Sequence, residues 1–222
     1  MNALKRIRFK KIIALCFGLL AVWIAIDLLY PFKTDISRID PARTAKMDAA
    51  MWKSYYEKKP LSLIFQSATL MRNQFHFPLW QSFRVAYYAA KAAFVFKDGK
   101  SRIDYQRALP PLKKYYRLID KISLHDFDAD SAAATELEWW IIRRERAQHP
   151  PAEWEQWIAA TPALMYHLPA ETFSEYAHLR VQAMLLRDAK GDSIAPADWQ
   201  NINGLLLRSW QSFAAALHPN GR

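Results

Sequence analysis

An unbroken apolar run near the N-terminus, from Ile12 to Ile26, constrains this chain more than any other feature. After Asp27 the run resumes for three residues, and Pro31 ends it. As a helix, the whole stretch 12–30 is about 28 Å long, close to the hydrocarbon thickness of roughly 30 Å in a bilayer. The pattern therefore predicts one transmembrane helix whose partner is the lipid bilayer.

A cleaved secretory signal is the main alternative, because residues 1–11 hold five basic side chains and no acid. No small-x-small cleavage site follows the run. A lipoprotein signal does not fit either, since Leu15 precedes the single cysteine, Cys16, where a small residue is required. We expect an uncleaved signal anchor, with the basic flank in the cytoplasm. In a bacterium this places a single-pass protein in the inner membrane with its soluble domain in the periplasm.

Asp27 lies near the far end of the predicted span. At this depth we expect its carboxylate to reach water at the membrane interface. The alternative is a contact with a basic group on another membrane subunit.

The chain behind the span has the pattern of an all-α bundle of about seven helices, several of them started by proline. Glycine is scarce, with five residues in 222, and no alternating run typical of a strand is present. One segment shows the helical spacing well, with apolar residues at Leu79, Phe83, Ala86, Ala90 and Phe94. The expected organisation is a basic flank (1–11), the span (12–30), a tether (31–39), one α-helical domain (40–218) and a short tail (219–222).

Prolines and capping residues set the expected helix boundaries. Asp40 caps the first helix of the domain, and Pro41 occupies its first position. We expect Asp130 to cap a later helix, and we expect breaks at Pro110-Pro111 and at Pro162. The expected helices are 40–58, 61–75, 78–98, 101–122, 130–146, one from 151, 169–190 and one from 196.

Charge is unevenly distributed along the soluble part. Residues 43–117 hold fifteen Lys and Arg against four acids, whereas residues 118–222 hold nine against fourteen. A basic half next to an anchor fits anionic lipid or an acidic protein partner. The same lysines and arginines are also typical of solvated helix faces. The acidic second half and the anchor argue against nucleic acid as a partner.

Two polar clusters are candidate sites. Arg84, Tyr88 and Lys91 repeat at helical spacing, and with the nearby Arg102 they form a candidate anion-binding set, although a solvated or salt-bridged face is the default explanation. The second set gathers carboxylates, indoles and a guanidinium on one predicted helix, and is a candidate interaction or polar cluster: Glu136, Glu138, Trp139, Trp140 and Arg143. Ion pairing and core packing are the simpler explanations of this second set.

Metal and cofactor chemistry has little support in the sequence. Glu175 and His178 match one Glu-x-x-His element, but a carboxylate-bridged metal bundle needs two such elements and further carboxylates. The stripe of Phe173, Ala177 and Val181 lies on another side of the same helix, so we expect the Glu/His stripe to face water. Glycine-rich phosphate loops and Gly-x-Ser-x-Gly motifs do not occur. We therefore expect no cofactor, no metal and no common type of enzyme.

The leading functional hypothesis is a membrane-anchored interaction module, an accessory, assembly or scaffold subunit whose partner is another membrane or periplasmic protein. One alternative is a domain that binds a small ligand, or an enzyme, with an anion-binding pocket. Another is a domain that associates with anionic lipid through residues 43–117.

Overall fold

The computed structural model describes residues 3–219, and within this range the chain is all-α. One isolated bridge between Thr34 and Ser123 is the single β-type pairing in that range. The α-helices are α1 (Ala3–Leu29), α2 (Pro41–Tyr56), α3 (Pro60–Gln74), α4 (Leu79–Asp98), α5 (Arg102–Gln106), α6 (Leu109–Ile122), α7 (Ala129–Arg144), α8 (Pro151–Tyr166), α9 (Ser174–Lys190) and α10 (Pro196–Leu217). Short 3₁₀ turns, Ala170–Phe173 and Gly191–Ser193, precede and follow α9.

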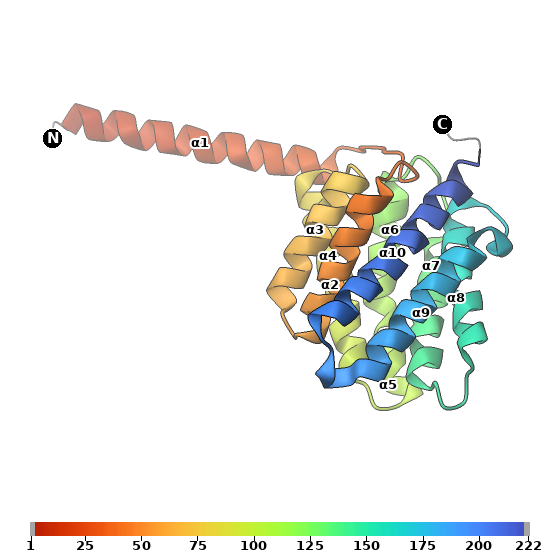
Figure 1. Ribbon diagram of the computed structural model, residues 1–222. Helices are drawn as coiled ribbons and strands as arrows, with labels where there is room; N and C mark the ends of the chain where they lie inside the picture. The colour runs from red at the N-terminus through yellow and green to blue at the C-terminus, as the bar shows by residue number, and fades with distance from the viewer. Residues whose placement is uncertain (1–2, 220–222) are drawn as a thin grey trace.

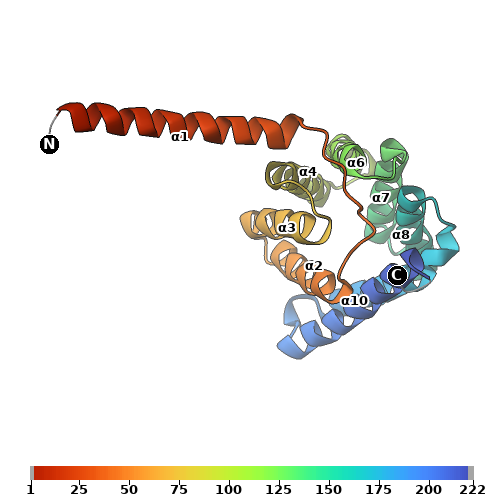
Figure 2. The same cartoon turned by 90° about the horizontal axis from the view of Figure 1, so that it is seen from above.

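The helices behind α1 form a closed ring. Along the series α2, α3, α4, α6, α7, α8, α9 and α10, each helix packs against the one before it, and α10 packs back against α2 (Figure 2). Short loops make neighbouring helices antiparallel, while the five-residue α5 lies across one end of the ring (Figure 1). Buried apolar side chains gather in two clusters inside the ring, one mainly from α3, α4, α6 and α7 and the other mainly from α2, α8, α9 and α10.

Most predicted helix starts are confirmed. Asp40 caps α2 by accepting from the amides of Ala42 at 3.0 Å and Arg43 at 3.2 Å. Prolines occupy the first turn of α2, α3, α6, α8 and α10, where a missing N–H costs nothing. The predicted core stripe of α9 is buried, and Glu175 and His178 face outward.

Three details of the helix prediction were wrong. Nine α-helices follow α1 in the described range instead of about seven, partly because the expected helix 101–122 is divided at Arg107–Ala108 and not at its prolines. Asp128, not Asp130, caps α7. Helix α8 runs unbroken through Pro162, although this proline cannot donate to the carbonyl of Ile158. Burial of Trp154, Ile158 and Pro162 along one side of α8 stabilises the continuous helix.

Helix α1 extends away from the ring, across the direction of the ring helices (Figure 1). Its segment Arg8–Leu29 is long and apolar enough to cross a membrane, and nearly all of it lies outside the protein interior. A core helix of a soluble protein would be covered instead. At the other end of the chain, the predicted tail lies outside the described residues from position 220 onward.

The expectation for Asp27 was wrong. Its side chain is buried, with 5% exposure, and its Oδ1 accepts from the amides of Trp80 at 3.0 Å and Gln81 at 3.2 Å. These are free N–H groups in the first turn of α4, whose own N-cap position is Pro78 and offers no side-chain acceptor. Gln81 donates in return to the carbonyl of Leu28 at 2.9 Å. The end of α1 therefore supplies the cap of α4, which fixes the junction between the anchor and the ring.

The predicted tether is a packed strap across one end of the ring (Figure 2). Thr34 accepts from the amide of Leu124 at 2.9 Å and donates its own to Ile122 at 2.8 Å. Ile36 is buried, and its carbonyl accepts from the hydroxyl of Tyr166 at 3.0 Å. Because the strap contacts both halves of the ring, it covers the end from which α1 leaves.

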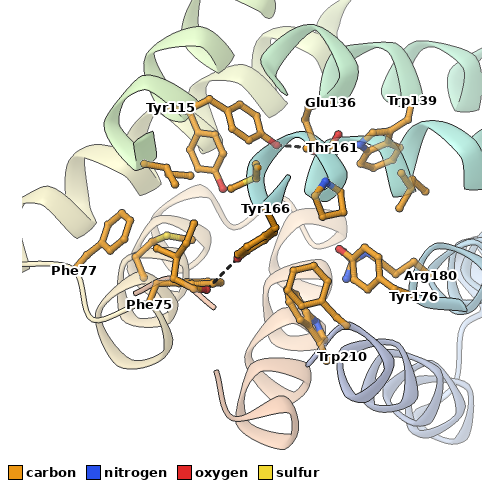
Figure 3. Close-up of a pocket in the computed structure, with 18 residues that line it drawn as sticks. Phe75, Phe77, Tyr115, Glu136, Trp139, Thr161, Tyr166, Tyr176, Arg180 and Trp210 are labelled. Atoms are coloured by element: carbon orange, nitrogen blue, oxygen red, sulfur yellow. Dashed lines mark hydrogen bonds between the residues drawn. The ribbon is translucent and has the colours of Figure 1, made fainter. Parts of the chain in front are cut away.

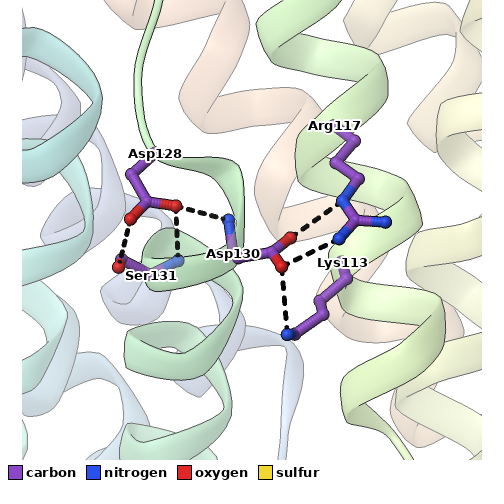
Figure 4. A network of polar contacts seen from close by, with 5 residues as sticks. All are labelled: Lys113, Arg117, Asp128, Asp130 and Ser131. Carbon is purple, nitrogen blue, oxygen red and sulfur yellow. Dashed lines mark hydrogen bonds and ion pairs between the residues drawn. The ribbon is translucent and has the colours of Figure 1, made fainter.

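A surface network joins α6 to α7 (Figure 4). Asp128 accepts from the amides of Asp130 at 3.0 Å and Ser131 at 3.1 Å, which caps α7. Asp130 is then free to bind Arg117 with two bonds of 2.8 Å and Lys113 at 3.1 Å. The hydrogen bond from Arg117 is the main cause of a lowered pKa of Asp130.

Replacing Asp27 should destabilise the ring. Asp27→Ala removes the acceptor at the start of α4 and should lower the free energy of unfolding by about 1 kcal/mol, the usual cost of a lost N-cap. Asp27→Asn keeps an acceptor oxygen and should cost clearly less. Thermal unfolding of the full chain in mild detergent, followed by circular dichroism, measures both. Equal stability of the alanine variant and the wild type would contradict the capping role.

The network at Asp130 should make stability depend on acid. Because its folded pKa is lowered, the ionised carboxylate stabilises the fold above its ordinary pKa of 3.8, and this contribution disappears as pH falls through the lower folded value. Asp130→Asn should therefore be less stable than wild type at neutral pH, with a gap that closes in strong acid. Unfolding curves across a pH series test this, and Arg117→Gln should reproduce the gap. A gap of constant size at all pH values would refute it.

Candidate functional site

The ring encloses space along its axis. Two cavities lie there, one of about 810 Å³ and one of about 200 Å³, and Figure 3 shows the smaller. The cavities share four wall residues: Tyr115, Glu136, Trp139 and Arg180. On the α4 side the larger cavity is lined by Ala89, Ala90 and Ala93, whose methyl groups are too short to fill it.

The smaller cavity lies under the strap and is mostly apolar. Ile36 contacts it from the strap, and Phe75, Phe77 and Phe213 line it from the ring. The hydroxyl of Thr161 is buried and has no hydrogen-bond partner among residues 3–219. This end of the axis is a small, mainly apolar cavity that adjoins the larger one through their shared wall residues.

The larger cavity reaches the opposite end of the ring. Its mouth is formed by the loop between α7 and α8, where Arg146, Ala147 and Gln148 are exposed. Indole and phenol rings make up much of the wall: Trp52, Tyr55, Tyr56, Trp139 and Trp140. Flat aromatic surfaces with a few charged groups among them are typical of sites for organic ligands.

A buried ion pair lies in the wall of the larger cavity. Arg180 of α9 donates to Asp48 of α2 at 2.6 Å, and the indole of Trp210 in α10 donates to the same carboxylate oxygen at 2.9 Å. The guanidinium also lies over the rings of Trp52 and Tyr176, 5.6 and 5.4 Å from their centres. Burial disfavours the charged form of Arg180, but the charge and hydrogen bond of Asp48, together with Tyr176 and Glu136, outweigh it and keep the pKa of Arg180 above its ordinary value.

Glu136 is the carboxylate closest to the shared part of the two cavities. Its oxygens accept from the hydroxyl of Tyr116 at 3.1 Å and the indole of Trp140 at 2.9 Å. Burial raises the pKa of Glu136, while hydrogen bonds from the neighbouring indoles and from Tyr116 act in the opposite direction. Glu136 therefore retains a proton to higher pH than an exposed glutamate does.

A second ion pair lies near the mouth. Arg143 donates through Nη2 to Asp188 at 2.8 Å and to the hydroxyl of Tyr56 at 3.2 Å. Its Nε is buried and makes no hydrogen bond within the described chain. A buried N–H without a partner costs about 1–3 kcal/mol.

The predicted anion-binding residues do not come together. Arg84, Tyr88 and Lys91 lie on α4, where Arg84 donates to Gln81 at 3.2 Å and both cationic side chains are exposed. Arg102 lies at the other end of the ring and pairs with Glu138 and with Glu145.

The second predicted cluster is divided between two sides of α7. Glu136, Trp139, Trp140 and Arg143 line the larger cavity, whereas Glu138 binds Arg102 outside it. Sequence reasoning missed Asp48, Arg180 and Asp188, which are far from α7 along the chain.

The weak metal candidate is not supported by its surroundings. His178 lies 2.9 Å from Glu155, and Glu175 is exposed. No group of three or more His, Cys, Asp and Glu side chains suited to a metal was found in the described part of the chain.

The ion pair of Asp48 and Arg180 should dominate the stability of this region. Arg180→Met or Asp48→Asn each leaves one buried partner uncompensated and should cost about 3–5 kcal/mol. The double variant should lose much less than the sum, because neither charge remains. Chemical unfolding of the four proteins gives the coupling energy. Additive losses would show that the two groups do not stabilise each other.

Comparison with known proteins found no family model, no curated protein and no solved structure that matches this chain. The function of this protein is therefore inferred from the geometry of the cavities and from the surface of the ring.

Proposed function

We propose that this protein is a membrane-anchored ligand-binding domain. Helix α1 holds it in the bilayer, and the larger cavity of the ring takes an organic molecule. The observation that carries this proposal is an aromatic-walled cavity of about 810 Å³ whose wall also contains the side chain of Arg143. Cavities of roughly 300–1,000 Å³ with a few convergent polar groups are typical of small-molecule sites.

The charges around the cavity favour a ligand with one acidic group. Arg143, Arg144 and Arg146 lie toward the mouth, where an anionic end would meet donors. Deeper in the cavity, Glu136 and Asp48 disfavour a second negative charge. The aromatic wall suits an apolar or aromatic body. We therefore expect an amphipathic monoanion, with its acidic group at the mouth.

Binding without catalysis is the better proposal for this cavity. Glu136 has the raised pKa expected of an acid–base group, but both of its oxygens already accept hydrogen bonds. Both hydrogen bonds fix the orientation of the carboxylate, and apart from these two donors no nucleophile or second acid–base group of residues 3–219 is paired with it. The carboxylate is better placed to orient Tyr116 and Trp140 than to react.

A scaffold or assembly subunit is the second candidate function. It is favoured by Trp157 and Leu164, which lie two turns apart on the outer side of α8 and are 39% and 38% exposed. Exposed tryptophan is common at protein interfaces. In this case another membrane or periplasmic protein would bind the outside of the ring, and the cavity would stay without a dedicated ligand.

The basic residues before the span indicate how the protein is oriented in the membrane, and this orientation is the same for both candidate functions. Lys5, Arg6, Arg8, Lys10 and Lys11 precede the span without an acid, which favours a cytoplasmic N-terminus. The domain is then periplasmic, in the inner membrane of a bacterium.

Titration of the full-length protein with 2-naphthoic acid tests the ligand proposal, because this molecule has an aromatic body and one carboxylate. Isothermal titration calorimetry in mild detergent, with a detergent blank, should show saturable binding. Arg143→Gln should weaken binding by roughly 10-fold to 100-fold, the value of a hydrogen bond to a charged group. Ala93→Leu fills the cavity without disturbing the helix, so it should abolish binding while the protein stays folded.

Arg208→Gln is the matched control, since Arg208 is exposed on α10 away from the cavity. It should bind like the wild type. Unchanged binding in both cavity variants would contradict the proposal. Absence of binding together with a stoichiometric co-purifying protein would favour the scaffold function instead.

A further inference from the structure

The outer side of α3 and α4 carries large apolar side chains that are exposed to solvent. Leu61 is 72% exposed, Phe65 58% and Tyr87 49%. Leu61 and Phe65 are one turn apart on α3, and Tyr87 lies on the neighbouring α4. Together with Phe83 and Trp80 of α4 we call these residues the aromatic face.

This face is continuous with the anchor. Phe65 packs edge-on against Phe83, with ring centres 5.4 Å apart, and Phe83 lies 6.3 Å from Trp80. Trp80 in turn lies 6.1 Å from Trp23 of α1. A line of ring contacts therefore runs from inside the predicted span onto the ring, and Trp is enriched where membrane meets water.

Positive charge surrounds the aromatic face. Residues 58–97 contain six basic side chains and no Asp or Glu: Lys58, Lys59, Arg72, Arg84, Lys91 and Lys97. Arg72, Arg84 and Lys91 are exposed and form no ion pair with any described residue. Apolar rings within a field of unpaired cations match an anionic lipid surface better than they match water.

The direction of α1 turns the aromatic face toward the membrane. Both ribbon views show α1 leaving the ring on the side of α3 and α4, across the direction of these helices (Figures 1 and 2). Asp27 holds the end of α1 to the first turn of α4, so the two helices keep this angle. A bilayer crossed by α1 then lies against the aromatic face.

We infer that the aromatic face docks onto the headgroup region of the bilayer that α1 crosses, with anionic lipid around Arg72, Arg84 and Lys91. This inference rests on the anchoring part of the proposed function and is independent of the cavity. The ring then lies on its side at the membrane, with its axis parallel to the bilayer plane. A second protein on the same face is the competing occupant, and the experiment below separates the two.

Three dye positions in the full-length protein, reconstituted in nanodiscs, test the inference. The native Cys16 is exposed on α1 and reports insertion. Phe65→Cys in a Cys16→Ser background reports the aromatic face. Gln156→Cys in the same background, on the exposed side of α8, is the matched control. The measurement is quenching of the dye fluorescence by lipids that carry a nitroxide. The nitroxide is on the acyl chain for the dye at Cys16 and on the headgroup for the dyes at positions 65 and 156. Each protein is measured in discs of phosphatidylcholine, with and without phosphatidylglycerol.

If the inference holds, the headgroup nitroxide quenches the dye at position 65 and not at 156, more strongly in anionic discs. Arg84→Gln should lower the ratio of docked to undocked protein by roughly fivefold, as expected for one charge at an anionic surface. Arg208→Gln, which removes a remote exposed charge, should leave it unchanged.

Equal quenching at positions 65 and 156, while Cys16 is quenched from the acyl chains, would overturn the docking inference and leave the anchor intact. An unquenched Cys16 would show instead that anchoring itself is wrong. Protection of position 65 that accompanies a second copy or another protein in native mass spectrometry would assign the face to that protein.

Discussion

The structure depends on one carboxylate at the seam where the two ends of the ring meet. Asp48 lies on α2, the first helix of the ring, and accepts from Arg180 of α9 and Trp210 of α10, the last two. Every other neighbouring pair in the ring is close in sequence, so its packing follows from short antiparallel connections. Helices α10 and α2 are far apart in sequence, so no short connection brings them together. A buried charge that needs both partners at once disfavours other ways of closing the ring.

Closure of this kind also produces the cavities. Eight helices, each packed mainly against its two neighbours, surround an axis that side chains must fill from all sides. At the strap end the rings of Phe75, Phe77 and Phe213 nearly fill it, whereas the alanines of α4 leave the other end open. Two of the cations in this wall, Arg143 and Arg180, pair with carboxylates of the same wall, so much of its charge is compensated.

Local features of this fold are predictable from the sequence, and its closure is not. Prolines and Asp40 mark most helix starts because their effects are confined to one turn. The sequence predicted Asp130 as the cap of α7, but Asp128 suits the same role equally well. What separates them is tertiary, because Asp130 binds Arg117 of α6 instead. The sequence identified only those residues of the larger cavity that lie on α7, because they are neighbours along the chain. Asp48, Arg180 and the cap from Asp27 need tertiary contacts across 53 to 162 positions, which no local pattern reveals.

The anchor and the cavity become related once the ring is placed on the membrane. With the aromatic face on the bilayer, the strap closes one end of the ring axis, and the loop between α7 and α8 lies at the other end, on the side of the ring opposite α3 (Figures 1 and 2). Helix α8, with Trp157 and Leu164, then lies on the side away from lipid (Figure 2). An amphipathic anion concentrates at the membrane interface, because its apolar part is favoured there over water. The mouth, however, belongs to the loop between α7 and α8 on the side away from lipid, so a ligand reaches the arginines at its rim from water and not from the bilayer surface.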